Sequence, residues 1–161
     1  MTHDATSATG IEHGHADYTA GELLEQCQAN AASLLLATAS VLAERGLDVE
    51  EWAAAVAAVL LRSWQPGASW PPAAMLDALL TNYRALGATV TSIDLTEEAP
   101  TATIEGYPDD ELAASLGVDP ALGEVMLHVG AHIARQLGCD FTWQRDGASI
   151  ALRVSRDSAS E

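Results

Sequence analysis

The chain has 161 residues, which suits one compact domain, and 23 acidic against 7 basic side chains give it a formal net charge of −16. This charge repels phosphate backbones and anionic lipid head groups, so we expect neither nucleic acid nor a membrane surface as a partner. All the basic residues are arginine, and the lack of lysine excludes phosphate-loop, Schiff-base and pyridoxal chemistries, which require the amine.

Cysteine content and the ends of the chain bear on the compartment. Cys27 and Cys139 are the only cysteines and lie far apart in sequence, so we expect reduced thiols in a cytoplasm rather than a disulfide scaffold. The N-terminus lacks the pattern of a signal peptide, and no apolar run reaches the ~20 residues of a membrane span. We expect flexible ends at 1–18 and 157–161 around a single domain at 19–156.

Two alanine-rich helices are predicted at the start of the domain. Thr19 and Glu22 form a capping-box pattern before a helix at about 20–45, whose apolar residues recur at helical spacing. Cys27 belongs to this apolar stripe, which predicts a core position for its thiol. A second helix near 49–63 is apolar on nearly every side, a pattern typical of helices buried on several faces or packed in an oligomer. We therefore expect a homodimer formed through the alanine-rich helices.

The rest of the chain alternates between strand and helix patterns. In order, we expect a helix opened by Pro71 and Pro72 and ending before Gly87, strands at 88–95 and 101–108, helices at 109–117 and 120–137, and strands at 139–145 and 149–156. The predicted fold class is α+β: N-terminal helices followed by ββ-αα-ββ, with the helices packed on one face of a four-stranded antiparallel sheet.

The helix at 120–137 carries the most distinctive polar pattern. Glu124, His128 and His132 are spaced four residues apart and so share one side, where they offer donors that zinc, nickel or iron accepts. Further ligands would come from Cys139, from the tail histidines or from a second subunit. The alternative is an ordinary polar helix face, with Cys139 as a buried, inert thiol on the core side of its strand.

Large aromatic side chains are the other candidates for a site. They either fill the core or surround an apolar pocket for a small molecule. The loop at 63–70, with two tryptophans among turn residues, is the predicted rim or lid. The candidate ligand-binding residues are Trp64, Trp70, Tyr83, Tyr107 and Trp143.

Residues from about 76 to 156 resemble the 4-vinyl reductase domain and the L-2-amino-thiazoline-4-carboxylate hydrolase-like family. The resemblance lies in the order of elements and in a Cys-x-Phe strand, matched by Cys139 and Phe141. It implies a pocket between helices and sheet for a small, largely apolar ligand. The Cys-Pro expected in hydrolase-like members is replaced by Tyr107 and Pro108, so thiol chemistry is not carried over there.

Three functions follow from these patterns. The first is a cytoplasmic small-molecule-binding or sensor-like domain. The second is a metal-dependent or hydrolase-like enzyme that uses Glu124, His128 and His132 with Cys139 nearby. The third is an acidic interaction subunit that docks a basic partner and has no chemistry of its own.

Overall fold

The computed structural model describes residues 18–64, 70–96 and 98–157, and within them the chain forms an α+β domain. Its elements are α1 (Ala20–Glu44), α2 (Val49–Leu60), the 3₁₀ helix η1 (Leu61–Ser63), α3 (Pro72–Ala85), β1 (Thr89–Asp94), β2 (Thr101–Glu105), α4 (Asp110–Ser115), the 3₁₀ helix η2 (Pro120–Glu124), α5 (Val125–Gln136), β3 (Cys139–Asp146) and β4 (Ser149–Arg156). The predicted order is confirmed. The predicted tail at 1–18 and C-terminus at 157–161 lie almost entirely outside the described residues.

Side-chain caps explain where the helices begin. Thr19 Oγ1 accepts a hydrogen bond from the Glu22 backbone N–H at 3.2 Å, and the Glu22 carboxylate accepts one from the Thr19 backbone N–H at 2.8 Å, which completes the capping box. Asp48 accepts a bond from the Glu50 N–H at the start of α2. Each of these bonds satisfies a backbone donor that has no partner within the helix.

The sheet is antiparallel throughout, with strand order β1-β2-β4-β3. The turn between β3 and β4 contains Gly147, whose positive φ of 59° suits a tight hairpin. The side chains of Cys139, Phe141, Ile150, Leu152 and Val154 alternate into the core, as the two-residue period of these strands predicts.

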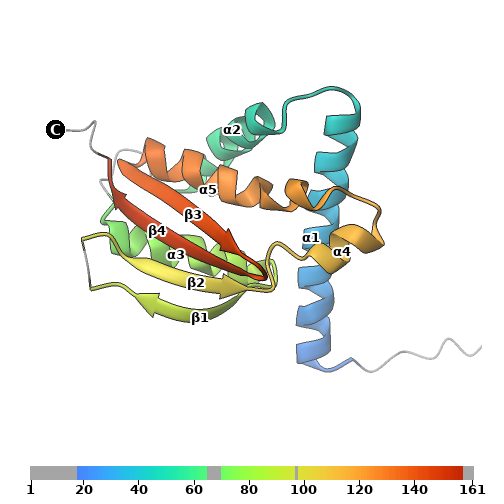
Figure 1. The fold of residues 1–161 in the computed structure, drawn as a ribbon, viewed down its shortest axis with the longest axis horizontal. Coiled ribbons are helices and arrows are strands. Elements are labelled where there is room, and N and C mark those ends of the chain that lie inside the picture. Colours follow the sequence, from blue (N-terminus) through green and yellow to red (C-terminus); the bar gives the residue numbers. More distant parts are fainter. Residues whose placement is uncertain (1–17, 65–69, 97, 158–161) are drawn as a thin grey trace, which may run out of the picture.

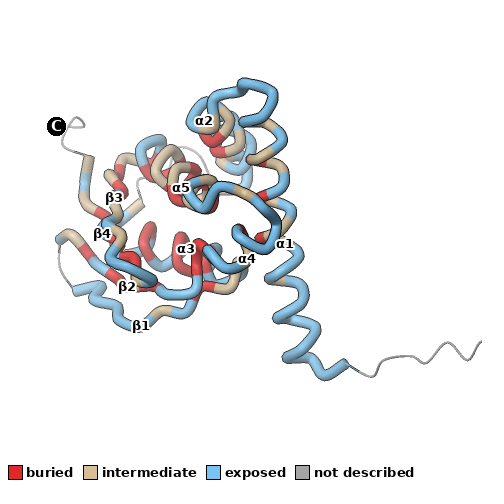
Figure 2. The backbone as a smooth tube through the Cα atoms, turned by 45° about the vertical axis from the view of Figure 1, so that its right-hand side comes forward, coloured by how far each residue is buried: buried red, intermediate tan, exposed pale blue. Residues whose placement is uncertain are grey.

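Helices cover one face of this sheet. Figure 1 shows α3 and α5 behind the strands; α3 contacts β4 and β1, and α5 contacts β3. On its other side α5 packs against α2, so it is covered from two directions. Leu127, Val129, Ile133 and Ala134 of α5 are buried. Buried segments gather between α3, α5 and the strands in Figure 2.

The long helix α1 differs from its prediction. It contacts η2, α4 and α2 through a face that contains Ala32, Leu36 and Ala39, and its N-terminal half is exposed (Figure 2). Cys27 is therefore exposed, and its predicted core position is wrong. The apolar residues of α1 do recur at helical spacing, as predicted. Most of them face solvent, however, because only the row with Ala32, Leu36 and Ala39 packs against the domain.

Within residues 18–64, 70–96 and 98–157, no helix combines the length and the apolar character needed to cross a membrane.

Candidate functional site

A cavity of about 130 Å³ lies between the end of α2, helix α3 and helix α5. No strand residue lines it, so it is a gap between helices rather than between helices and sheet. The lining residues are Leu60, Ser63, Trp64, Leu79, Asn82, Tyr83, Met126, Val129, Gly130 and Ile133.

Gly130 lines the cavity at the point where α3 side chains approach the α5 backbone closely. It lies in the middle of α5, where glycine is less favourable than alanine by about 1 kcal/mol. A Cβ at this position would collide with the Tyr83 hydroxyl oxygen and would come within 3.2 Å of Leu79 Cδ2. The missing side chain thus lets the Tyr83 phenol approach the α5 backbone.

Tyr83 is the unusual residue of the cavity. Only 1% of its surface is exposed, and its hydroxyl is the one buried side-chain polar atom without a hydrogen-bond partner among the described residues. Leaving such a group unpaired in an apolar interior costs about 1–3 kcal/mol. Burial raises the pKa of the Tyr83 hydroxyl well above its ordinary value, so the group stays neutral and keeps its proton for donation.

Neighbouring rings hold Tyr83 in place. Its ring stacks on Tyr107, with centroids 5.9 Å apart and planes 13° apart, and it lies 6.3 Å from the Phe141 ring. The Tyr107 hydroxyl, in contrast, donates to the Gly123 carbonyl at 3.0 Å. Two stacked and buried tyrosines therefore differ in one respect: the hydroxyl of Tyr107 has a partner and that of Tyr83 has none.

Two other polar side chains of the lining already have partners. The Asn82 amide donates to the Ala78 carbonyl at 2.9 Å, and the Ser63 hydroxyl donates to the Leu60 carbonyl at 2.7 Å. No lining residue is charged. Among the described residues the lining is therefore largely apolar and uncharged, and the Tyr83 hydroxyl is its one fully buried side-chain polar atom without a partner.

Trp64 separates this cavity from a more open hollow of about 310 Å³, which is lined by Ser63, Trp64, Trp70 and Ala78. The centroids of the Trp64 and Trp70 rings are 5.4 Å apart. These tryptophans bound the predicted rim at 63–70, of which residues 65–69 lie outside the described residues.

The two histidines of α5 meet Glu50 of α2 instead of a metal ligand set. Glu50 Oε2 is 2.6 Å from His128 Nδ1, and Glu50 Oε1 is 2.8 Å from His132 Nε2. The Glu50 carboxylate therefore occupies the ring nitrogens of His128 and His132 that face α2. The arrangement connects α5 to α2. Sequence reasoning missed Glu50, which is 82 positions from His132.

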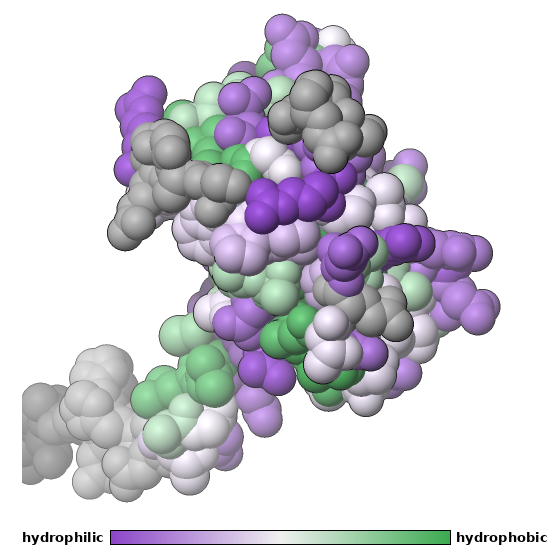
Figure 3. All heavy atoms as spheres, turned by 90° about the vertical axis from the view of Figure 1, so that its left-hand side faces the viewer, coloured by the Kyte–Doolittle hydropathy of each residue, from purple (hydrophilic) through white to green (hydrophobic). Residues whose placement is uncertain are grey.

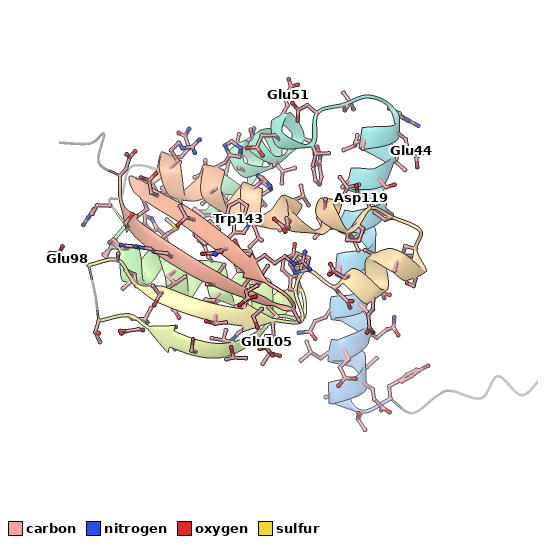
Figure 4. The ribbon with its side chains drawn as sticks, in the orientation of Figure 1. Glu44, Glu51, Glu98, Glu105, Asp119 and Trp143 are labelled. Atoms are coloured by element: carbon pink, nitrogen blue, oxygen red, sulfur yellow. The ribbon has the colours of Figure 1, made fainter. Side chains whose placement is uncertain are left out.

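Glu124 belongs to a different group of contacts. Its carboxylate accepts from Trp143 Nε1 at 3.0 Å and lies 3.5 Å from Arg145 Nη1, while Arg145 Nη2 pairs with Asp110 at 2.5 Å. The hydrogen bond from Arg145 to Asp110 raises the pKa of the guanidinium, which stays charged. Trp143, labelled in Figure 4, projects toward α5, and its ring packs edge-to-face with the His128 ring, with centroids 5.0 Å apart. These contacts join β3, α4 and η2.

Cys139 lies apart from the histidine contacts. It is fully buried, its Sγ is 3.4 Å from the Trp70 carbonyl oxygen, and burial raises the pKa of its thiol. In the part of the chain that the structure describes, no group of three or more His, Cys, Asp and Glu side chains is arranged to hold a metal ion. The structure thus does not assemble Glu124, His128, His132 and Cys139 into one site.

Of the predicted ligand-binding residues, Trp64 and Tyr83 line the cavity, Trp70 lines the adjoining hollow, Tyr107 supports Tyr83 from behind, and Trp143 lies elsewhere. The aliphatic lining and Gly130 were missed. The one available signal was a glycine inside a strongly amphipathic helix, which is unfavourable unless close packing requires it.

In comparisons with known proteins, no family model, no curated protein and no solved structure matches this chain. The resemblance to the 4-vinyl reductase domain stays a prediction.

Proposed function

We propose that this chain is a small-molecule-binding domain. Its cavity would take one flat, neutral, largely apolar molecule that carries a hydrogen-bonding group for Tyr83. The observation that carries the proposal is the unpaired Tyr83 hydroxyl beside an apolar cavity of about 130 Å³. We place this binding in the cytoplasm as part of the proposal, because both cysteines are free thiols.

The volume and the lining define the ligand. An apolar cavity of about 150 Å³ is large enough to bind benzene, so this slightly smaller one suits a single ring with at most a small substituent. The lining offers no charge to pair with an ionised ligand, and burial of an unpaired charge is strongly unfavourable. A carbonyl or ether oxygen would accept the Tyr83 proton and remove the cost of leaving it unpaired.

The two other functions have less support. At 100° per residue, His128 and His132 project from a different side of α5 from Val129, Gly130 and Ile133. Glu124 lies before α5, in η2, and none of the three lines the cavity. Acidic side chains labelled in Figure 4, among them Glu44, Glu98 and Glu105, come from elements all around the molecule and form no single docking face for a basic partner.

The test compares three one-ring compounds: toluene, acetophenone and benzoate. Titration calorimetry should show that acetophenone binds about two- to tenfold more tightly than toluene, the gain of one hydrogen bond, and that benzoate does not bind. Tyr83→Phe should abolish the preference for acetophenone. Tyr107→Phe is the matched control and should retain it, because the Tyr107 hydroxyl points to Gly123. Failure of both neutral compounds to bind would refute the proposal.

A further inference from the structure

Helix α1 carries a second feature that the cavity does not explain. A row of residues with alternating spacings of four and three follows its exposed side; we call this row the α1 seam. It consists of Ala20, Leu24, Cys27, Ala31, Leu34, Thr38 and Val41. Leu34 is 70% exposed and Leu24 58% exposed, so the largest apolar side chains of the seam lie mostly in solvent.

The spacing of the seam is that of helices that pair along their length. Apolar or small residues every 3.5 positions keep facing a neighbouring helix over many turns. From Ala20 to Val41 the seam is about 32 Å long, at 1.5 Å per residue. The Thr38 hydroxyl donates to the Leu34 carbonyl at 2.7 Å within α1, so its polar group is already satisfied. Figures 1 and 3 show the lower part of α1 standing clear of the domain, with apolar side chains on it.

Charge indicates what covers the seam. Between Glu25 and Glu44, α1 contains no charged residue, although the whole chain has a net charge of −16. A basic partner would find no carboxylate in this stretch to bind. Two copies of this chain repel each other over most of their surfaces, and an uncharged stretch is where that repulsion is weakest.

The seam is also complementary to itself. When two α1 helices are placed antiparallel with full overlap, Ala31 lies opposite Leu34, and Cys27 lies opposite Thr38. The first pair combines a large side chain with a small one, and the second combines two side chains of moderate size, as close helix packing requires. The N-terminal residues 1–17 offer only Met1 and Ile11 as large aliphatic side chains, which is too few to cover such a row.

We propose that the chain forms a symmetric homodimer in which the α1 seams of two copies pack antiparallel about a twofold axis between Ala31 and Leu34. Each seam then buries the apolar side chains that the single chain leaves in water. The proposal is independent of the cavity and of its ligand.

Sedimentation of the full chain over a range of concentrations tests association. The wild type should shift from monomer to dimer as concentration rises. Leu34→Glu should raise the dimer dissociation constant more than about a hundredfold, because symmetry buries two unpaired carboxylates in the seam. Leu116→Glu is the matched control; it replaces an exposed leucine of the α4 C-cap and should leave the dimer intact. A monomeric wild type, or a dimer that tolerates Leu34→Glu, would overturn the proposal.

Disulfide trapping tests the orientation. In the antiparallel pair, Thr38→Cys places a new thiol opposite Cys27 of the second copy, and mild oxidation should link the two chains. Within one helix these positions are about 16 Å apart and do not react with each other. Ala37→Cys, one position away and off the seam, should not link. If oxidation rapidly links two wild-type chains through Cys27 alone, the α1 helices pair in parallel. If the purified chain is a monomer and only cell extract protects Cys27 from oxidation, the seam binds a different partner. Either result contradicts the proposal.

Discussion

In a folded chain, apolar side chains are usually buried and buried polar groups are usually hydrogen-bonded. The cavity beside α5 breaks the second of these rules, and the seam on α1 breaks the first. At the cavity, a polar hydroxyl is buried among apolar side chains without a partner. On α1, apolar side chains are exposed along an uncharged stretch of an acidic protein. Natural sequences tend to break such rules where function requires it. The size of the missing partner differs: a single ring fits at the cavity, whereas the seam needs a whole helix.

The largest expected difference comes from truncating a leucine of α3, one of the helices that border the cavity, and a leucine of the α1 seam. Leu76 is fully buried in α3, so Leu76→Ala should lower the free energy of unfolding by about 2–5 kcal/mol. Leu34→Ala should change it by less than about 0.5 kcal/mol in dilute, monomeric protein. Urea denaturation measures both values. A comparable loss from the two variants would mean that the α1 seam is already packed within the single chain.

Adding a methyl group sharpens the same comparison. Gly130→Ala should destabilise the fold by about 1–3 kcal/mol through overlap with the Tyr83 hydroxyl. Most of this loss should disappear in the Tyr83→Phe background, where the overlapping oxygen is gone. Gly21→Ala is the matched change in α1; its Cβ has no neighbour closer than Thr19 Oγ1 at 3.9 Å, so stability should stay level or rise slightly. If Gly130→Ala destabilises the fold equally in the Tyr83→Phe background, the added methyl group collides with a group other than the Tyr83 hydroxyl.

A smaller effect separates the two buried tyrosines. Tyr107→Phe should lower the free energy of unfolding by about 1 kcal/mol, because the Gly123 carbonyl loses its donor. Tyr83→Phe should be neutral or stabilising, since it removes a hydroxyl that has no partner. The same urea titration applies to both variants, and equal losses would show that the Tyr83 hydroxyl is bonded in solution.

The two thiols provide the mildest test. At slightly alkaline pH a disulfide reagent should label Cys27 rapidly and leave Cys139 unlabelled until the protein unfolds, because burial both hides the Cys139 thiol and raises its pKa. Labelling of Cys27 should slow as concentration rises and the α1 seams pair. Rapid labelling of both thiols in the native protein would contradict the buried position of Cys139.

Local signals account for most of what the sequence predicted correctly. The capping box of Thr19 and Glu22 and the two prolines Pro71 and Pro72 each act over a few residues and fix where α1 and α3 start. Strand alternation then identified the inner face of β3 and β4. Such signals depend on near neighbours, so one sequence is enough to show them.

What the sequence could not predict depends on distant neighbours. Helical periodicity showed that α1 has an apolar stripe, but it does not show whether a stripe faces its own chain, and so Cys27 was misplaced. The pairing of Glu50 with His128 joins two helices far apart in the chain. The unpaired state of Tyr83 depends on what α5 presents opposite α3, which no local pattern encodes.

The contact between Trp64 and Trp70 has an optical consequence. An indole ring changes its fluorescence with the polarity and mobility of its surroundings, and Trp64 lines the same cavity as Tyr83. Trp143 is hydrogen-bonded to Glu124, and neither Trp143 nor Trp52 lines the cavity, so these two provide a steady background. Emission from the unlabelled protein therefore reports whether the cavity is filled.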